Sequence, residues 1–138
     1  MTANIKTMCD SIGKGDYLLV QFGHNDEKTD DADRGTYPGL DFSTLDNEGK
    51  NANGQYSYEW TILNKYVRVA QAKGATVVLV TPVARRSSDG TANYKSHVAY
   101  VEGLVALGKE YNIPVIDMTT KTATLYQLLR PHQWKLPQ

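Results

Sequence analysis

Apolar residues along this chain form three short runs that are separated by longer polar or periodic segments. The runs cover residues 16–22 (DYLLVQF), 76–81 (TVVLVT) and 113–117 (IPVID), and Gly, Pro or Asp residues bound them. Short runs that are rich in β-branched residues and apolar at consecutive positions are typical of strands buried on both faces. Such strands belong to parallel sheets. The pattern therefore predicts three strands of one parallel sheet.

Segments with helical periodicity lie before, between and after these runs. Residues 2–13 and 119–130 predict helices at the two ends, and Gly13 is placed to end the first. Residues 56–74 place one apolar stripe on a helix, at Trp60, Leu63, Val67 and Ala70. Residues 92–112 predict a second stripe, at Tyr94, Val98, Val101 and Val105. We expect four helices that alternate with the three strands.

This alternation determines the expected fold class. Strands that alternate with helices form an open α/β sheet whose crossover connections are right-handed. Residues 1–138 are short enough to form a single domain of this kind. In such sheets, ligands bind beyond the carboxyl ends of the strands. Candidate chemistry is therefore sought in the segments that follow 16–22, 76–81 and 113–117.

A long polar segment, residues 27–55, follows the first predicted strand. It is rich in Asp, Asn, Gly, Lys and Thr, and loops of this length are more often functional than idle. We expect it to wall a site at the sheet edge, the alternative being a solvated surface insertion. A calcium loop is disfavoured, because Gly49 would take the first ligand position and Glu59 falls one residue early.

Composition narrows the classes of partner. Fifteen Lys and Arg residues balance fifteen Asp and Glu residues without a basic run, which disfavours nucleic acid and anionic membranes as partners. The single cysteine, Cys9, excludes an internal disulfide and makes a cysteine-based zinc site implausible. We expect no metal and no cofactor. Neither a membrane span nor a signal peptide is recognisable, and the sequence leaves the localisation open.

The tetrapeptide Gly23-His24-Asn25-Asp26 follows the first predicted strand directly. The side-chain amide of Asn25 is suited to bind the oxyanion of an ester-cleavage transition state, a contact worth about 3 to 4 kcal/mol. Gly23 lets the chain turn sharply off the strand, and Asp26 can accept backbone N–H groups and hold the loop. The alternative is a polar turn without catalytic function.

Three segments in order resemble one enzyme family. "GDYLLVQFGHND", "AKGATVVLVTPVARR" and "IPVIDMTTKTATLY" are similar to blocks of the SGNH, or GDSL, hydrolases, and most of all to their rhamnogalacturonan-acetylesterase-like branch. The similarity runs from about residue 12 to residue 129. It implies a three-layer, flavodoxin-like α/β fold and serine acyl transfer on an acetylated polysaccharide or oligosaccharide. It also implies that Asn25 is the oxyanion-hole donor.

Other polar residues near the predicted edge have weaker assignments. His24 is the only histidine near this loop in the sequence, and we expect it to orient the loop or line the cleft, because the family's catalytic histidine comes from a late Asp-x-x-His motif. Arg85 and Arg86 follow the second predicted strand, and their forked donors suit a substrate carboxylate or hydroxyl. The alternative is a solvated pair of charges.

Ser11 lies in Cys9-Asp10-Ser11, which looks like a Gly-Asp-Ser nucleophile motif. Ser11 precedes the strand at 16–22, however, and Asn25 follows it. Seven strand residues separate the two by roughly 20 Å, whereas a nucleophile and its oxyanion donor both contact the reacting group. We expect Ser11 to be a decoy, and the nucleophile remains unassigned.

Relative to the resembled family, the sequence lacks the Ser, Gly and Asp-His blocks. His132 has Leu129, not an acid, three residues before it, and the tail 130–138 matches no block. We expect a chain without the first two of five strands and without the C-terminal catalytic segment. The alternative to an esterase is a catalytically incomplete chain with only binding or structural capability. Strand 16–22 would then be an apolar edge, which self-association, a second copy or the N-terminal helix would cover.

Overall fold

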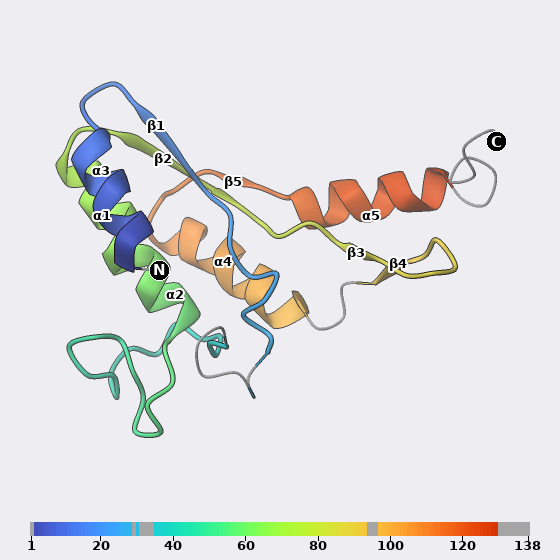
Figure 1. Ribbon diagram of the computed structural model, residues 1–138, viewed down its shortest axis with the longest axis horizontal. Helices are drawn as coiled ribbons and strands as arrows, with labels where there is room; N and C mark the ends of the chain where they lie inside the picture. The colour runs from blue at the N-terminus through green and yellow to red at the C-terminus, as the bar shows by residue number, and fades with distance from the viewer. Residues whose placement is uncertain (1, 29, 31–34, 94–96, 130–138) are drawn as a thin grey trace.

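The computed structural model describes residues 2–28, 30, 35–93 and 97–129 (Figure 1). Three strands form a parallel sheet in the order β1-β2-β5, and two short strands, β3 and β4, form an antiparallel hairpin. The elements in chain order are α1 (Thr2–Ser11), β1 (Tyr17–Val20), α2 (Tyr58–Thr61), the π-helical η1 (Ile62–Val67), α3 (Arg68–Ala72), β2 (Thr76–Val80), β3 (Arg85–Arg86), β4 (Ala92–Asn93), α4 (Val98–Glu110), β5 (Val115–Ile116) and α5 (Met118–Leu128).

The three predicted strands are confirmed as the three strands of the parallel sheet. Leu18 of β1 lies opposite Val77 of β2, and Val80 of β2 lies opposite Ile116 of β5. Each strand is shorter than the apolar run that predicted it, by one to three residues: β1 covers Tyr17–Val20, β2 Thr76–Val80 and β5 Val115–Ile116. The parallel α/β class expected from the sequence is therefore correct. Among the described residues the sheet has three of the five strands that the resemblance implies.

The core lies on one face of this sheet. Val20, Val77 and Leu79 point to that face and pack against η1, α3 and α4. In Figure 1, α1, α2, α3 and α4 lie to one side of the strands, and α5 extends from the carboxyl end of β5. Both crossovers place their helices on the same face because the strand order follows the chain order and right-handed crossovers do not change side. The largest fully buried apolar side chains of these helices are Tyr58, Ile62, Leu63, Val67, Leu104 and Leu107.

The stripe predicted for the segment 92–112 is wrong. The helix begins at Val98, residues 92–93 form β4 instead, and Tyr94 lies outside the described residues. Val98 and Val105 are 38% and 43% exposed, and the buried face of α4 consists of Tyr100, Leu104, Leu107 and Gly108. Apolar residues lie on both faces of this helix, so periodicity alone does not distinguish the buried one.

Turn chemistry organises the described part of the long segment after β1. Asn51 Oδ1 accepts the N–H groups of Asn53 and Gln55, and short bridges pair Lys50 with Tyr56 and Tyr37 with Ser57. Gly49 lies against the ring of Trp60, which is therefore half-buried over this segment and not in the core, as its predicted stripe position had suggested. The Asn and Gly content reflects these turns.

The outer edge of β1 and one face of the sheet carry exposed apolar side chains. Tyr17 is 71% exposed and Leu19 is 60% exposed, while Ile5, Met8 and Ile12 around α1 pack against the core. Helix α1 therefore does not cover these residues. The three expected ways to cover the hydrogen-bonding edge of β1 stay predictions.

Candidate active site

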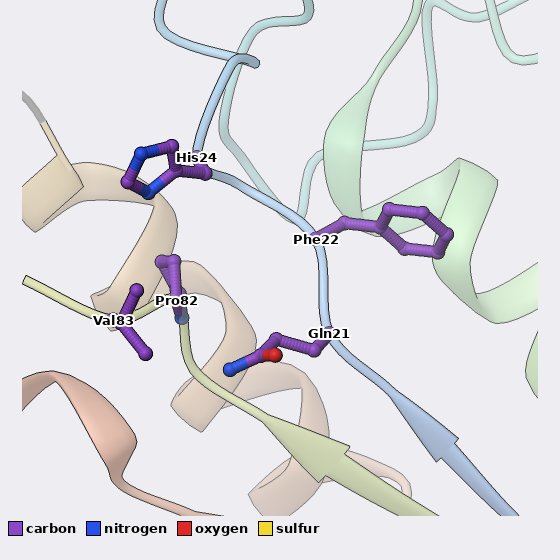
Figure 2. Close-up of a pocket in the computed structure, with 5 residues that line it drawn as sticks. All are labelled: Gln21, Phe22, His24, Pro82 and Val83. Atoms are coloured by element: carbon purple, nitrogen blue, oxygen red, sulfur yellow. The ribbon is translucent and has the colours of Figure 1, made fainter.

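The carboxyl ends of β1 and β2 meet at an open pocket with a volume of about 190 Å³. Its lining consists of Gln21, Phe22, His24, Pro82 and Val83 (Figure 2). Gln21 donates to the carbonyl of Thr81 across the two strand ends, at 3.1 Å. Figure 2 shows Phe22 and His24 on opposite sides of the backbone that leaves β1. The pocket lies where an open α/β sheet is expected to bind its ligand.

Gly23 makes the turn off β1 possible. Its φ is +114°, and a Cβ atom here would lie 3.1 Å from both Pro82 Cγ and the hydroxyl of Tyr58. That hydroxyl donates to the carbonyl of Phe22 at 2.9 Å, so the backbone on either side of Gly23 packs against buried groups. Only glycine adopts this conformation at low cost and leaves space for both neighbours.

Asp26 holds the loop together after this turn. Its carboxylate accepts the backbone N–H of Gly23 and the hydroxyl of Thr36, both at 2.9 Å. Its carbonyl accepts the N–H of Thr36 at 3.0 Å and the hydroxyl of Tyr100 at 2.9 Å. Burial raises the pKa of Asp26 above its ordinary value, and the two hydrogen bonds to its carboxylate oppose that effect. The loop-holding geometry expected for Asp26 is present.

The long segment, residues 27–55, contacts the loop 23–27 and stabilises it. Thr36 belongs to it and joins Asp26, and Gly39 donates its N–H to the buried carboxylate of Glu59 on α2, at 2.8 Å. The five residues that line the pocket come instead from the ends of β1 and β2. In its described part, the segment thus contacts the loop 23–27, and its role as a wall of the site stays a prediction.

The side chain of Asn25 is exposed at the tip of this loop. Neighbouring turns hold its backbone, since the carbonyl of Asn25 accepts the N–H of Lys28 at 3.1 Å. A fixed backbone that presents an exposed amide is the arrangement that an oxyanion donor requires. The catalytic role of Asn25 remains a prediction.

His24 lines the pocket, at the place that its expected role requires. Its ring lies 5.1 Å from the ring of His97, a residue that is far away in the sequence and fully buried at the start of α4. Burial, with the positive charge of Arg85 nearby, lowers the pKa of His24 below its ordinary value. His24 is therefore neutral at neutral pH.

Arg85 is turned inward. Its Nη2 donates to the carbonyl of His24 at 2.6 Å and lies 3.2 Å from a carboxylate oxygen of Glu27. Arg86, the next residue, is exposed. The two arginines that the sequence treats as equivalent thus differ in environment, because successive residues of a strand face opposite sides. A substrate contact by either remains a prediction.

Ser11 and Cys9 lie in α1, at the other end of β1 from Asn25. The hydroxyl of Ser11 donates to the carbonyl of Thr7 within the same helix, at 2.6 Å. This arrangement agrees with the geometric argument that Ser11 is a decoy. None of the five pocket-lining residues carries a hydroxyl or a thiol.

Asp117 follows β5 at the same sheet edge and caps α5. Its carboxylate accepts the N–H of Thr120 at 2.9 Å and the hydroxyl of Thr81 at 3.3 Å. Burial acts to raise the pKa of Asp117, but these hydrogen bonds outweigh burial, and its pKa lies below its ordinary value. Asp117 therefore acts as an ionised helix cap.

Within residues 2–28, 30, 35–93 and 97–129, no group of three or more His, Cys, Asp and Glu side chains is arranged to hold a metal ion. No helix in this part of the chain is long and apolar enough to cross a membrane.

Several residues of the site have no signal in the sequence. Glu27, Glu59, His97 and Tyr100 carry no motif. His97 and Tyr100 contact the loop 23–27 from more than seventy residues away, and Glu59 contacts Gly39 of the long segment. These residues can be recognised as part of the site only in the folded chain, where they lie close together. A polar residue inside an apolar helical pattern, such as Glu59 between Tyr58 and Trp60, is the one cue available.

Comparison with known proteins identifies relatives of the chain. No family model matches it. It is 35% identical to rhamnogalacturonan acetylesterase RhgT of Bacillus subtilis over 132 residues, which are 95% of this chain and 48% of the relative. The chain is homologous to about half of this relative. A second B. subtilis relative, named "probable rhamnogalacturonan acetylesterase YesY", is 27% identical over 122 residues, or 88% of this chain and 48% of the relative.

The chain spans about half the length of these acetylesterase relatives. This share agrees with the expectation that the resemblance covers only part of the family's domain. Solved structures support the fold. Protein YXIM of B. subtilis matches with a TM-score of 0.56 at 20% identity, over 91% of this chain and 30% of that one. A possible lipase of Chitinophaga pinensis matches with a TM-score of 0.54 at 18% identity, over 86% and 49%.

Proposed function

We propose that this chain carries the oxyanion-binding part of a serine acetylesterase that acts on acetylated polysaccharide, with Asn25 as the side-chain donor. The observation that carries this proposal is the exposed amide of Asn25 at the carboxyl edge of the sheet, on a loop braced from Tyr58, Thr36 and Tyr100. Acyl transfer develops negative charge on the ester carbonyl oxygen, and a preorganised N–H donor stabilises it. Homology to rhamnogalacturonan acetylesterases supports acetylated pectic sugars as the substrate class.

Acetate release tests this proposal. The substrates are an acetylated pectic oligosaccharide and p-nitrophenyl acetate, and the variants are Asn25→Ala, Ser11→Ala and the control Asn53→Ala, which removes an exposed amide from the long segment. Because no nucleophile is assigned in this chain, the first measurement is whether the wild type releases acetate. Where it does, Asn25→Ala should lower kcat by about 10²- to 10³-fold. The other two variants should retain the wild-type rate. Activity that Ser11→Ala abolishes, or that survives Asn25→Ala, would contradict the proposal.

A second candidate is a chain that binds acetylated sugar without turnover. The absence of a hydroxyl or thiol among the five pocket-lining residues favours it. The same oligosaccharide, titrated into the isotope-labelled chain, should then shift the amide resonances of residues 21–25 and 82–83 while no acetate appears. Shifts without turnover select this candidate, and turnover eliminates it.

We further propose that the chain self-associates through β1 and the adjoining sheet face. Among the described residues, β1 pairs with β2 alone, so the other side of β1 has no strand partner in this part of the chain. Tyr17 and Leu19 are mostly exposed beside that edge. Unpaired apolar edges favour pairing with another strand, and a second copy offers the same edge.

A further inference from the structure

Three charged or polar side chains from different parts of the chain converge on one peptide group, the one between His24 and Asn25. Arg85 belongs to β3, and His97 is the residue that precedes α4. Glu27 belongs to the loop 23–27, which also contains this peptide group. Arg85 Nη2 lies 2.6 Å from the carbonyl oxygen of His24, and His97 Nε2 lies 3.3 Å from it. Thus two donors from elements distant in the sequence hold one carbonyl.

Glu27 links these two donors. One of its carboxylate oxygens lies 3.2 Å from Arg85 Nη2, and the other lies 3.1 Å from His97 Nε2. His97 Nε2 therefore lies beside two groups, the carbonyl of His24 and the carboxylate of Glu27. Because both neighbours of Nε2 are acceptors, this nitrogen must carry a hydrogen. We name Arg85, Glu27 and His97 the clamp.

The clamp is buried enough to be rigid. The side chain of His97 is fully buried, that of Glu27 is 15% exposed and that of Arg85 is 34% exposed. Pairs at this depth are screened less by water than surface pairs, and removing one member leaves a charge without its partner. The three side chains therefore depend on one another for their positions.

The orientation of the peptide group between His24 and Asn25 determines the position of the Asn25 Cα atom. In a trans peptide, the carbonyl and the following N–H point in opposite directions. The carbonyl of His24 points inward to the clamp, so the N–H of Asn25 points the other way, and the plane of this peptide sets the position of the Asn25 Cα atom. An oxyanion donor must be held to within about 0.5 Å of its productive position.

We propose that Arg85, with Glu27 and His97, is a positioning residue that orients Asn25 as an oxyanion donor and does not itself bind substrate. This inference rests on the proposed function for the reaction, although the clamp itself can be tested without turnover. It assigns a task to His97 and Glu27, for which the sequence offers none. It gives Arg85 a positioning role that Arg86 does not share.

The first experiment measures order in the loop. Amide hydrogen exchange and ¹⁵N relaxation are recorded by NMR for the wild-type chain, Arg85→Ala, Arg85→Lys and the control Arg86→Ala. Arg85→Ala should raise amide exchange of residues 24–27 by about tenfold or more, because their local opening becomes easier. Arg85→Lys should fall between the wild type and Arg85→Ala, since one ammonium cannot reproduce the forked contact with His24 and Glu27. Arg86→Ala should match the wild type.

A spectroscopic signature accompanies this experiment. In the wild type, the ¹⁵N shifts of His97 should show a hydrogen on Nε2, and Glu27→Gln should change them without unfolding the chain. If Arg85→Ala fails to fold, Arg85→Lys and Glu27→Gln supply the same comparison. Loop exchange in Arg85 variants that equals that of Arg86→Ala, or a His97 ring without hydrogen on Nε2, would overturn the clamp.

The second experiment uses acetyl-ester kinetics to distinguish positioning from substrate binding. Arg85→Ala should lower kcat and leave KM within about twofold, and the double variant Asn25→Ala/Arg85→Ala should be no slower than Asn25→Ala alone. A KM that rises while kcat is kept would make Arg85 a substrate contact and overturn the inference. If no form of the chain hydrolyses esters, the proposed function fails. The amide-exchange and relaxation measurements then still test whether the clamp orders the loop.

Discussion

Gly23 shows how one residue can control the geometry of the site. Its φ of +114° is strained for any other residue, and a Cβ atom would press on Pro82 and Tyr58. We expect Gly23→Ala to lower the free energy of unfolding by about 2 to 3 kcal/mol in urea denaturation. Gly54→Ala is the matched control, since Gly54 has a φ of +77° but no atom within 4 Å of the added methyl group.

In Gly54→Ala, the free energy of unfolding should fall by only about 1 kcal/mol, which is the cost of the backbone conformation alone. The difference between the two variants measures the close approach of the loop to Pro82 and Tyr58. Equal losses would show that the contacts at Gly23 carry no energy.

Glu59 is the second residue whose surroundings have a measurable consequence. It is fully buried on α2, and one of its oxygens accepts the N–H of Gly39. The other oxygen has no hydrogen-bond partner among the described residues. Burial raises the pKa of Glu59 from 4.5 to about 7, despite the hydrogen bond from Gly39. Asp26 nearby acts in the same direction.

Between pH 4.5 and 7, the folded chain therefore retains a proton on Glu59 that the unfolded chain has lost. The free energy of unfolding should fall as pH rises through this window, by up to about 3 kcal/mol. Glu59→Gln should remove most of this fall when urea denaturation is repeated across the range. Glu102→Gln, which changes an exposed glutamate on α4, should retain it. An unchanged fall in Glu59→Gln would exclude Glu59 as its source.

At the scale of elements, α2 and α4 meet where Glu59 lies against Gly103. A Cβ atom at Gly103 would lie 1.8 Å from Glu59 Oε1, a distance at which the helices must separate or the carboxyl must move. Helix propensity alone would make Gly103→Ala stabilising by about 1 kcal/mol. We expect the variant to be destabilised instead, because a buried side chain and two packed helices adjust poorly.

Thermal unfolding of Gly103→Ala gives the sign directly. A higher melting temperature than that of the wild type would mean that propensity dominates at this contact. The position of the long segment depends on the same carboxyl group, because the N–H of Gly39 donates a hydrogen bond to Glu59. Faster proteolysis of the segment should therefore accompany the loss of stability.

At the scale of the whole molecule, the uncovered side of the sheet governs assembly. Light scattering coupled to size-exclusion chromatography should show an oligomer for the wild type. Leu19→Lys should shift it to monomer, because a charge beside the edge of β1 opposes strand pairing. Leu125→Lys, the same change at an exposed leucine of α5, should leave the oligomer intact. A monomeric wild type would contradict self-association.

The fold class was within reach of the sequence, because it depends on local patterns. Buried strands read as apolar runs whatever they pack against, and the order of strands and helices limits the topology. The buried face of α4 was not within reach. Val98 and Val105 are as apolar as Leu104 and Leu107, and only the sheet decides which of them is buried.

The sequence by itself determined the parallel α/β class, the position of Asn25 after a strand, and the separation of Ser11 from it. Each of these follows from periodicity and from distance along the chain. Only the tertiary structure decided that Arg85 turns inward, that His97 and Glu27 meet it, and that Glu59 holds Gly39. These contacts join residues as far apart as Glu27 and His97, and they form only when burial removes water from polar groups that must then bind one another.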